Sequence, residues 1–159
     1  MNKNETFDKI VTMHLKMVLK IAFTYTKNTQ DAEDIAQEVF LALLKQSKTY
    51  SSEEHLKSWL IRVTINKSKN FVKSRWFSKK QELPDDLSYL PDNQSDLLDA
   101  ILSLDEKYRL PIHLFYYEGY SIREIAHILR TKPATIGTRL KRGREQLKKI
   151  LGGVDYFAE

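Results

Sequence analysis

The stretch that decides the fold of the C-terminal third is residues 121–148, SIREIAHILRTKPATIGTRLKRGREQLK. Ser121 and Glu124 form a capping box, which marks the start of an amphipathic helix. Pro133 suits the first position of a second helix, because the N–H that proline lacks would have no helical partner there. Only a short turn separates the two helices, and the small side chain of Ala126 lies where they must cross closely. This arrangement predicts a helix-turn-helix.

The second helix of this motif is strongly basic and carries the candidate contacts to duplex DNA. Arginine and lysine neutralise phosphates and pair with guanine in the major groove, and threonine reaches phosphate oxygens or a thymine methyl. A solvated basic helix is the simpler interpretation, but the cap, the turn and the basic face coincide here and favour DNA binding. The predicted contacts are Thr135, Thr138, Arg139, Lys141, Arg142 and Arg144.

The N-terminal half is predicted to be almost entirely helical. Residues 1–83 contain neither glycine nor proline, the residues that most often interrupt helices. Apolar residues at spacings of three and four predict helices at about 6–26, 31–47 and 54–76, with a polar connector at 47–54. The apolar side of the third helix is predicted to carry Leu56, Trp59, Leu60, Val63 and Phe71.

Residues 77–95 have the composition of a linker, since they combine two prolines with acidic side chains. No basic residue occurs between Glu82 and Asp99. Such a segment is typical of a tether between folded units. An acidic linker that shields or mimics nucleic acid is the alternative.

The pattern after the linker is again helical, and it completes the predicted architecture. Helices are expected at about 96–104, 105–118, 121–129 and 133–151, with Asp105 capping the second of them. The predicted fold is therefore all-α, with two small helical domains joined by a flexible acidic linker. We expect an N-terminal helical bundle at 1–76, the linker at 77–95 and a C-terminal helix-turn-helix domain at 96–152.

Two helices of the N-terminal domain contrast in charge. The helix at 31–47 is acidic in its first half, where negative charge suits the positive end of the helix dipole. By contrast, residues 57–80 contain eight basic residues and no acidic one. A basic face interleaved with aromatic and amide side chains suits single-stranded DNA. Trp59 and Phe71 at helical spacing are nevertheless more typical of a core.

Composition excludes several classes of protein. The 159 residues carry a formal net charge of +5 and a sequence pI of about 9.3, which favours a polyanionic partner. The absence of cysteine excludes disulfides, thiol catalysis and zinc sites built on thiolates. Without a signal-peptide pattern or a bilayer-spanning apolar run, the chain is expected to be cytoplasmic and not inserted in a membrane.

Nothing in the sequence predicts an enzyme. The four histidines lack metal-ligand spacing, and the acidic pair Glu33–Asp34 has no obvious polar partner. A recombinase with a DNA-binding tail would need paired carboxylates with a metal, or a nucleophile with an activating base. We therefore expect no catalytic residues, no metal, no cofactor and no small-molecule substrate.

Five segments, taken in order, resemble one family. Residues 31–40, DAEDIAQEVF, and 59–66, WLIRVTIN, resemble the second conserved region of extracytoplasmic-function sigma factors of the sigma-70 family. Residues 104–109, LDEKYR, 120–126, YSIREIA, and 134–144, ATIGTRLKRGR, resemble the fourth region. The resemblance spans nearly the whole chain and places a linker where the family has one.

The resemblance implies an alternative sigma factor that binds core RNA polymerase, directs it to promoters and promotes transcription initiation. The acidic helix would dock on the clamp coiled coil of the beta-prime subunit through Asp31, Glu33, Asp34, Gln37 and Glu38. The connector at 47–54 and the basic helix would engage the separated strands of the −10 element, the helix through Arg62, Asn66, Lys69 and Asn70. The second helix of the helix-turn-helix would read the −35 element as duplex. The apolar side of the C-terminal domain would hold the flap tip of the beta subunit, and an anti-sigma factor is an expected partner.

The chain departs from the family at Gly137, a position that is often basic in its members. One alternative function also stays open, a helix-turn-helix repressor or activator whose N-terminal helices dimerise or bind a ligand. That protein would bind duplex DNA tightly by itself, commonly as a symmetric dimer on a palindrome. A sigma factor binds weakly alone and opens promoters only with core polymerase.

Overall fold

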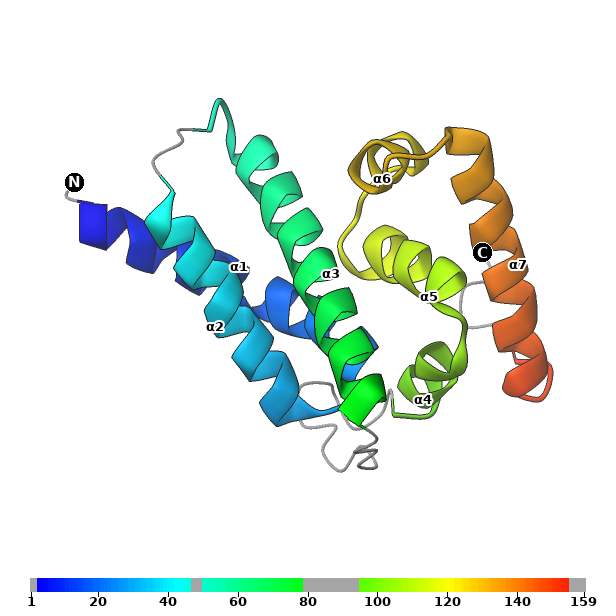
Figure 1. Ribbon diagram of the computed structural model, residues 1–159. Coiled ribbons are helices and arrows are strands. Elements are labelled where there is room, and N and C mark those ends of the chain that lie inside the picture. Colours follow the sequence, from blue (N-terminus) through cyan, green and yellow to red (C-terminus); the bar gives the residue numbers. More distant parts are fainter. Residues whose placement is uncertain (1–2, 47–49, 79–94, 155–159) are drawn as a thin grey trace. The chain divides into compact units, whose positions relative to one another are not determined.

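The computed structural model describes residues 3–46, 50–78 and 95–154, and over these residues the chain is helical with no strand. The chain divides into two compact units, residues 1–86 and 87–159, each of which is described by itself (Figure 1). The expected all-α fold of two helical units is confirmed. Most of the predicted linker lies outside the described residues, although α3 continues to Ser78 and α4 begins at Ser95.

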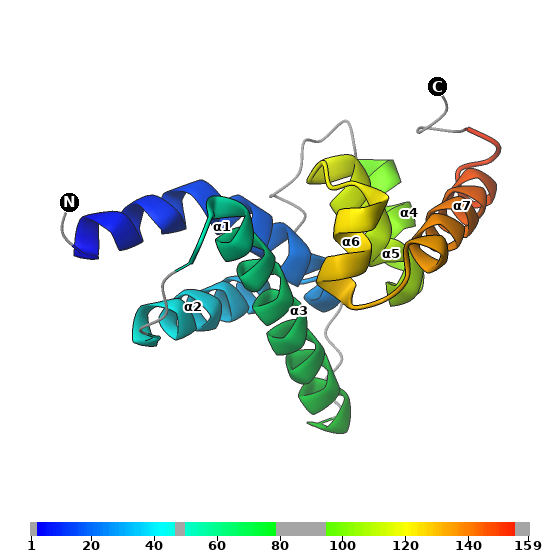
Figure 2. The same cartoon turned by 90° about the horizontal axis from the view of Figure 1, so that it is seen from above.

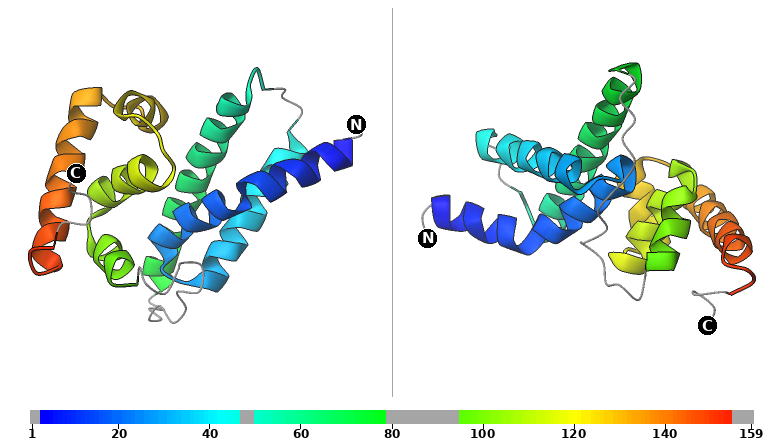
Figure 3. Two further views of the ribbon diagram at one scale, coloured as in Figure 1. Left: turned by 180° about the vertical axis from the view of Figure 1, so that it is seen from behind. Right: turned by 90° about the horizontal axis from the view of Figure 1, so that it is seen from below.

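The first unit contains α1 (Lys3–Thr26), α2 (Thr29–Lys45) and α3 (Glu53–Ser78). Each of these helices packs against the other two, and the view from behind shows α1 crossing α2 and α3 obliquely (Figure 3). The shared core is largely aliphatic and includes Val18, Ile21, Ile35, Val39, Leu60 and Ile61. All three helices expected from the sequence are confirmed, with ends shifted by up to three residues.

The apolar side predicted for α3 is partly wrong. Leu56 and Leu60 are buried as expected, but Trp59, Val63 and Phe71 are only half-buried. The rest of the buried face consists of Ile61, Thr64, Ile65 and Ser68. Two small hydroxyl residues are tolerated there because α1 and α2 both pack closely on α3. The buried hydroxyl of Thr64 donates to the carbonyl of Leu60 at 2.6 Å, so its polarity is satisfied within the helix.

The second unit contains α4 (Ser95–Ser103), α5 (Glu106–Ile112), the π-helical turn η2 (His113–Tyr117), α6 (Ile122–Leu129) and α7 (Pro133–Ile150). The helix expected at about 105–118 is present, as α5 followed directly by the π-helical η2. Pro111 lies inside this segment and lacks the N–H of a regular helical bond. After it the helix widens into η2, where the N–H of Glu118 donates to the carbonyl of His113 at 3.2 Å.

Two details of this unit differ from the sequence expectation. Asp105 occupies the N-cap position of α5, but its side chain makes no capping hydrogen bond. Ala126 is buried as a crossing residue should be, and a further close approach of two helices, not expected from the sequence, is at Gly143. A Cβ atom on Gly143 would lie 2.5 Å from Cδ1 of Ile112 and 3.3 Å from Cβ of Tyr108. This glycine therefore allows α7 to pack directly on α5.

Candidate functional site

The helix-turn-helix predicted from residues 121–148 is confirmed in detail. The Ser121 hydroxyl accepts from the N–H of Glu124 at 3.1 Å, and the Glu124 carboxylate accepts from the N–H of Ser121 at 2.9 Å. Arg130 ends α6 in the left-handed region with φ of 56°, and Pro133 begins α7. The top view shows the short turn that joins α6 to α7 (Figure 2). The capped α6 and the short turn fix the direction of α7 relative to α6.

One side of α7 is open to solvent and carries most of the predicted DNA contacts. Thr138, Lys141 and Arg142 are exposed, and Thr135 and Arg139 are half-buried. Spacings of three and four place Thr135, Thr138 and Arg142 along one line of the helix. The hydroxyl of Thr138 donates to the carbonyl of Ala134 at 3.1 Å, so it presents its methyl group and an acceptor outward. This surface, Thr135, Thr138, Arg139, Lys141 and Arg142, is called the α7 face below.

Arg144 lies apart from the α7 face. It is half-buried, and its Nη1 donates to the hydroxyl of Tyr116 in η2 at 3.0 Å. Its neighbour Gly143 faces the interior. The sequence alone did not indicate this contact, because apolar periodicity predicted a helix here without distinguishing the π-helical η2 from an α-helix. Arg144 thus links α7 to η2 within the unit.

Gly137 has open space around it. Nothing lies within 4 Å of the position that a Cβ would take there. The family-typical larger side chain would fit without clash, so the glycine affects helix stability rather than packing.

In the first unit, the exposed side of α2 is acidic and partly apolar. Glu33, Asp34, Gln37 and Glu38 are all exposed, as the docking prediction requires. Leu41 and Leu44 are 49% and 39% exposed on the same helix, and sequence reasoning did not single them out. Their signal was two leucines outside the buried stripe of Ile35, Val39 and Leu43. This surface, Glu33, Asp34, Gln37, Glu38, Leu41 and Leu44, is called the α2 face.

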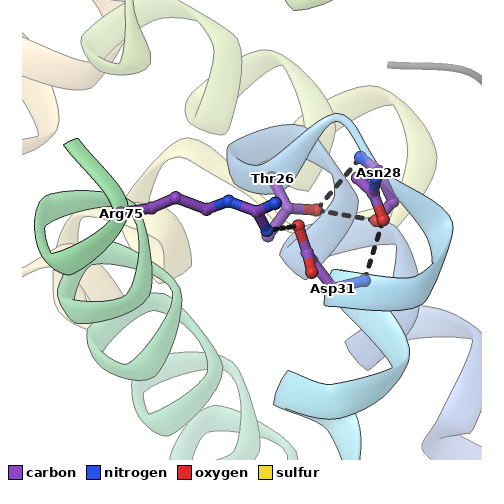
Figure 4. Close-up of polar contacts among 4 residues, drawn as sticks. All are labelled: Thr26, Asn28, Asp31 and Arg75. Atoms are coloured by element: carbon purple, nitrogen blue, oxygen red, sulfur yellow. Dashed lines mark hydrogen bonds and ion pairs between the residues drawn. The ribbon is translucent and has the colours of Figure 1, made fainter. Parts of the chain in front are cut away.

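Asp31 belongs to a different environment. It is half-buried in the first turn of α2, and its carboxylate pairs with Nη1 of Arg75 in the last turn of α3 (Figure 4). The structure therefore separates Asp31 from the four other residues predicted to dock on polymerase.

The exposed side of α3 carries the residues predicted to contact separated DNA strands. Asn66, Lys69 and Asn70 are exposed and Arg62 is half-buried, at spacings that keep all four on one side of the helix. Lys73 is exposed and continues the same line, although it was not among the predicted contacts. This surface, Arg62, Asn66, Lys69, Asn70 and Lys73, is called the α3 face.

Three aromatic rings lie together where α3 begins. The rings of Tyr50 and Trp59 are 6.0 Å apart between centroids, and those of Tyr50 and His55 are 5.1 Å apart. Burial raises the pKa of Tyr50, and a hydrogen bond from Gln46 opposes that rise. Trp59 is half-buried among these rings rather than in the aliphatic core. The connector predicted at 47–54 is only partly described, because residues 47–49 lie outside the described ranges.

The described residues hold no group of histidine, cysteine and carboxylate side chains arranged for a metal ion. None of the helices in these ranges has the length and apolar character that a membrane span requires. The buried titratable groups belong to the packing. Burial lowers the pKa of His14, an effect that Glu53 opposes and Lys57 reinforces. Nε2 of His113 lies 3.2 Å from Oε2 of Glu118, both side chains being largely buried.

The geometry defines a class of protein: a helical DNA-binding protein of two units. One unit contains a helix-turn-helix, and the other has an acidic face on α2 and a basic face on α3. Comparison with known proteins gives the family. The model of Sigma-70 region 2 matches residues 10–78, and the model of Sigma-70, region 4 matches residues 94–147.

Individual relatives agree with these matches. The chain is 30% identical to the ECF RNA polymerase sigma factor SigE of Mycolicibacterium smegmatis, over 92% of this chain and 62% of that protein. It is 29% identical to the RNA polymerase sigma factor SigV of Bacillus subtilis, over 87% of this chain and 86% of that protein. The solved structure of the sigma factor RpoE of Bartonella quintana, in complex with the anti-sigma factor NepR, matches with a TM-score of 0.76 and 23% identity. That match covers 93% of this chain and 98% of that one, and it shows the fold.

The chain belongs to the sigma-70 family, in its extracytoplasmic-function group. It is an alternative sigma factor, the subunit class that directs RNA polymerase to promoters. The resemblance predicted from residues 31–66 and 104–144 is thereby confirmed.

Proposed function

We propose that this sigma factor docks on the clamp coiled coil of the beta-prime subunit of core polymerase through the α2 face. The exposed acidic side chains Asp34 and Glu38 supply the charge, and Leu41 and Leu44 supply apolar area that single charges do not. Charged groups fix register and association rate, whereas buried apolar anchors provide most of the affinity. Asp31 is the exception among the predicted docking residues, because its carboxylate is paired with Arg75.

The α3 face would hold the separated strands of the −10 element. Arg62, Lys69 and Lys73 offer charge to the phosphates, and Asn66 and Asn70 offer amide groups that hydrogen-bond to unpaired bases. Because these side chains are on the exposed side of α3, they could contact phosphates and unpaired bases without any rearrangement of the core. The half-buried Trp59 lies at the edge of this face, with its ring among Tyr50 and His55.

The α7 face would read the −35 element in the major groove. Arg142 and Thr138 lie on the outward line of the helix and are the residues best placed to meet base edges, with Arg139 and Lys141 on its flanks. Arg144 was predicted to share this role. Its hydrogen bond to Tyr116 instead supports a role in holding α7 on η2.

The remaining partners follow from the family. The apolar side of the second unit would take the flap tip of the beta subunit. An anti-sigma factor would cover the α2 and α7 faces. The RpoE structure, solved in complex with the anti-sigma factor NepR, supports a partner of this class. Sigma factors are regulatory subunits without chemistry of their own, and because core polymerase is cytoplasmic the proposal places the chain in the cytoplasm.

The observation that carries the proposal is the pairing of an acidic, partly apolar α2 face with a basic α3 face in one compact unit. A free-standing repressor needs no such second surface. The test is association with purified core polymerase. The double variant Asp34→Lys, Glu38→Lys should lose binding to core while its circular dichroism and melting temperature stay unchanged.

A matched control is Glu145→Lys, which reverses an exposed acidic residue in the second unit. It should bind core as the wild type does. Unchanged binding by the double variant, or equal loss by the control, would contradict the assignment of the α2 face.

A further inference from the structure

The feature that the proposed function leaves unused is the ion pair between Arg75 and Asp31. It joins the last turn of α3 to the first turn of α2 across 44 residues of sequence. Figure 4 shows the two side chains meeting between the helices. Their side chains are 29% and 16% exposed, so the contact is partly shielded from water and from salt.

Hydrogen bonds hold the turn before α2, and with it the backbone of Asp31, in place. The side chain of Asn28 caps α2 by accepting from the N–H of Asp31 at 3.0 Å. Thr26 fastens Asn28 in turn, since its hydroxyl donates to the Asn28 carbonyl at 3.0 Å and accepts from the Asn28 N–H at 3.3 Å. Asp31 also lies in the first turn of α2, where the helix dipole favours a negative charge. Its position is therefore set by the backbone and not by Arg75 alone.

The guanidinium of Arg75 is oriented by a contact within α3. It lies 5.7 Å from the centroid of the Phe71 ring, one turn earlier in α3. Arginine stacks on an aromatic face and at the same time keeps its N–H groups for a carboxylate. Arg75 thus points toward α2, away from the α3 face.

The part of α3 from Lys69 to Arg75 has no buried side chain. Among the described side chains of α3, burial ends at Ser68, and all those that follow to Arg75 are exposed or half-buried. This last part carries Lys69, Asn70 and Lys73, which make up more than half of the α3 face. Because the described side chains of this part contribute little core packing, a polar contact such as the Arg75–Asp31 pair can help to set its direction.

We propose that Asp31 is a positioning residue for the α3 face: through Arg75 it sets the direction of the end of α3, and it does not itself contact polymerase. The proposal rests on the proposed function, because the α3 face is assigned there to the −10 strands. It removes one residue from the predicted docking surface and gives it a role in promoter opening.

A polymerase-free experiment tests the geometry. The chain has no cysteine, so cysteines introduced at the exposed positions Gln30 and Ser74 can be spin-labelled selectively. The distance between the labels should be narrowly distributed in the otherwise unchanged chain. It should broaden to the same extent with Asp31→Asn and with Arg75→Gln. The control Asp34→Asn removes an exposed acid of the same helix and should leave the distribution narrow.

Reconstitution with core polymerase then separates positioning from docking. Asp31→Asn and Arg75→Gln should both leave the affinity for core unchanged and lower promoter opening about two- to fivefold, the range expected for one ion pair. The double variant should lose no more than either single variant, because the two residues act through one contact. Asp34→Asn should show the opposite split, with weaker core binding and normal opening at saturating concentration.

Three results would overturn the inference. One is a label distance that neither Asp31→Asn nor Arg75→Gln broadens. Another is core binding that Asp31→Asn weakens and Arg75→Gln does not, which would make Asp31 a direct polymerase contact. The third is additive loss in the double variant. If wild-type protein fails to open any promoter, the proposed function fails, while the label distances still decide whether the Asp31–Arg75 pair sets the direction of α3.

Discussion

Two glycines in α7 should respond in opposite directions to the same substitution. Gly137 and Gly143 are both helical, and alanine is favoured over glycine in a helix interior by about 1 kcal/mol. At Gly137 a Cβ meets open space, so Gly137→Ala should stabilise the second unit by about 0.5–1 kcal/mol. At Gly143 the same Cβ would come within 2.5 Å of Cδ1 of Ile112, which must move.

The magnitude at Gly143 is the difference between two terms. Overpacking of a well-packed interface costs about 1–3 kcal/mol, and the gain in helix propensity offsets about 1 kcal/mol of it. The flexible end of Ile112 can shift, but the Cβ of Tyr108 at 3.3 Å is fixed to the backbone of α5. Because that atom cannot move away, the overpacking cost falls in the upper part of its range, about 2–3 kcal/mol. After the gain in helix propensity, Gly143→Ala should destabilise the second unit by about 1–2 kcal/mol. For a unit of this size, that corresponds to a fall in melting temperature of roughly 4–16 °C.

The assay has to report on the second unit alone. Both tryptophans, Trp59 and Trp76, are in the first unit, so their fluorescence provides an internal reference that neither variant should move. Loss of the backbone amide signals of α6 and α7 during denaturation gives the stability of the second unit. The packing argument is refuted if Gly143→Ala is as stable as wild type. It is also refuted if Gly137→Ala destabilises the second unit by more than about 0.5 kcal/mol, because helix propensity alone should stabilise that variant by up to about 1 kcal/mol.

Three further predictions follow. Arg142→Ala should weaken −35 recognition by about 1–3 kcal/mol in a footprinting titration, whereas Arg144→Ala should mainly lower the stability of the second unit; equal effects on DNA binding would refute the distinction. Ser121→Ala should lower the stability of the second unit by about 0.5–2 kcal/mol, because it removes the cap of α6. The same amide signals measure this loss, and the stability of the first unit should stay unchanged. His14 has a lowered pKa in the folded state, so the unfolded chain binds the proton more readily; stability should be full above the ordinary pKa of 6.5 and decline as the pH falls below it. His14→Gln should flatten that decline in pH-dependent melts, and an unaltered slope would mean that another group is responsible.

The sequence predicted the helix-turn-helix well because its determinants are local. The capping box of Ser121 and Glu124 and the proline at the start of α7 act within one turn of chain, and both are found as expected. The long stretch without glycine or proline likewise predicted α1, α2 and α3. Local signals of this kind need no knowledge of what packs on a helix.

The sequence was less informative where tertiary contacts decide the structure. The buried side of α3 includes Thr64 and Ser68 because two helices pack on it. A search for periodic apolar residues does not identify such small hydroxyl residues as part of the core. Pro111 was compatible with a helix by pattern, but it is followed by η2, which brings Tyr116 to Arg144. The pairing of Asp31 with Arg75 spans 44 residues, so no local motif could predict it.

The central claim is that the two units act together on promoter DNA only as part of polymerase. The most direct measurement is initiation in vitro from a genomic promoter pool, with purified core polymerase and with the protein alone. The account predicts defined transcripts with core, their loss when Asp34 and Glu38 are both replaced by lysine, and only weak binding to duplex DNA by the protein alone. Tight binding of the free protein to a palindrome as a dimer, with no initiation from any promoter in the pool, would contradict it.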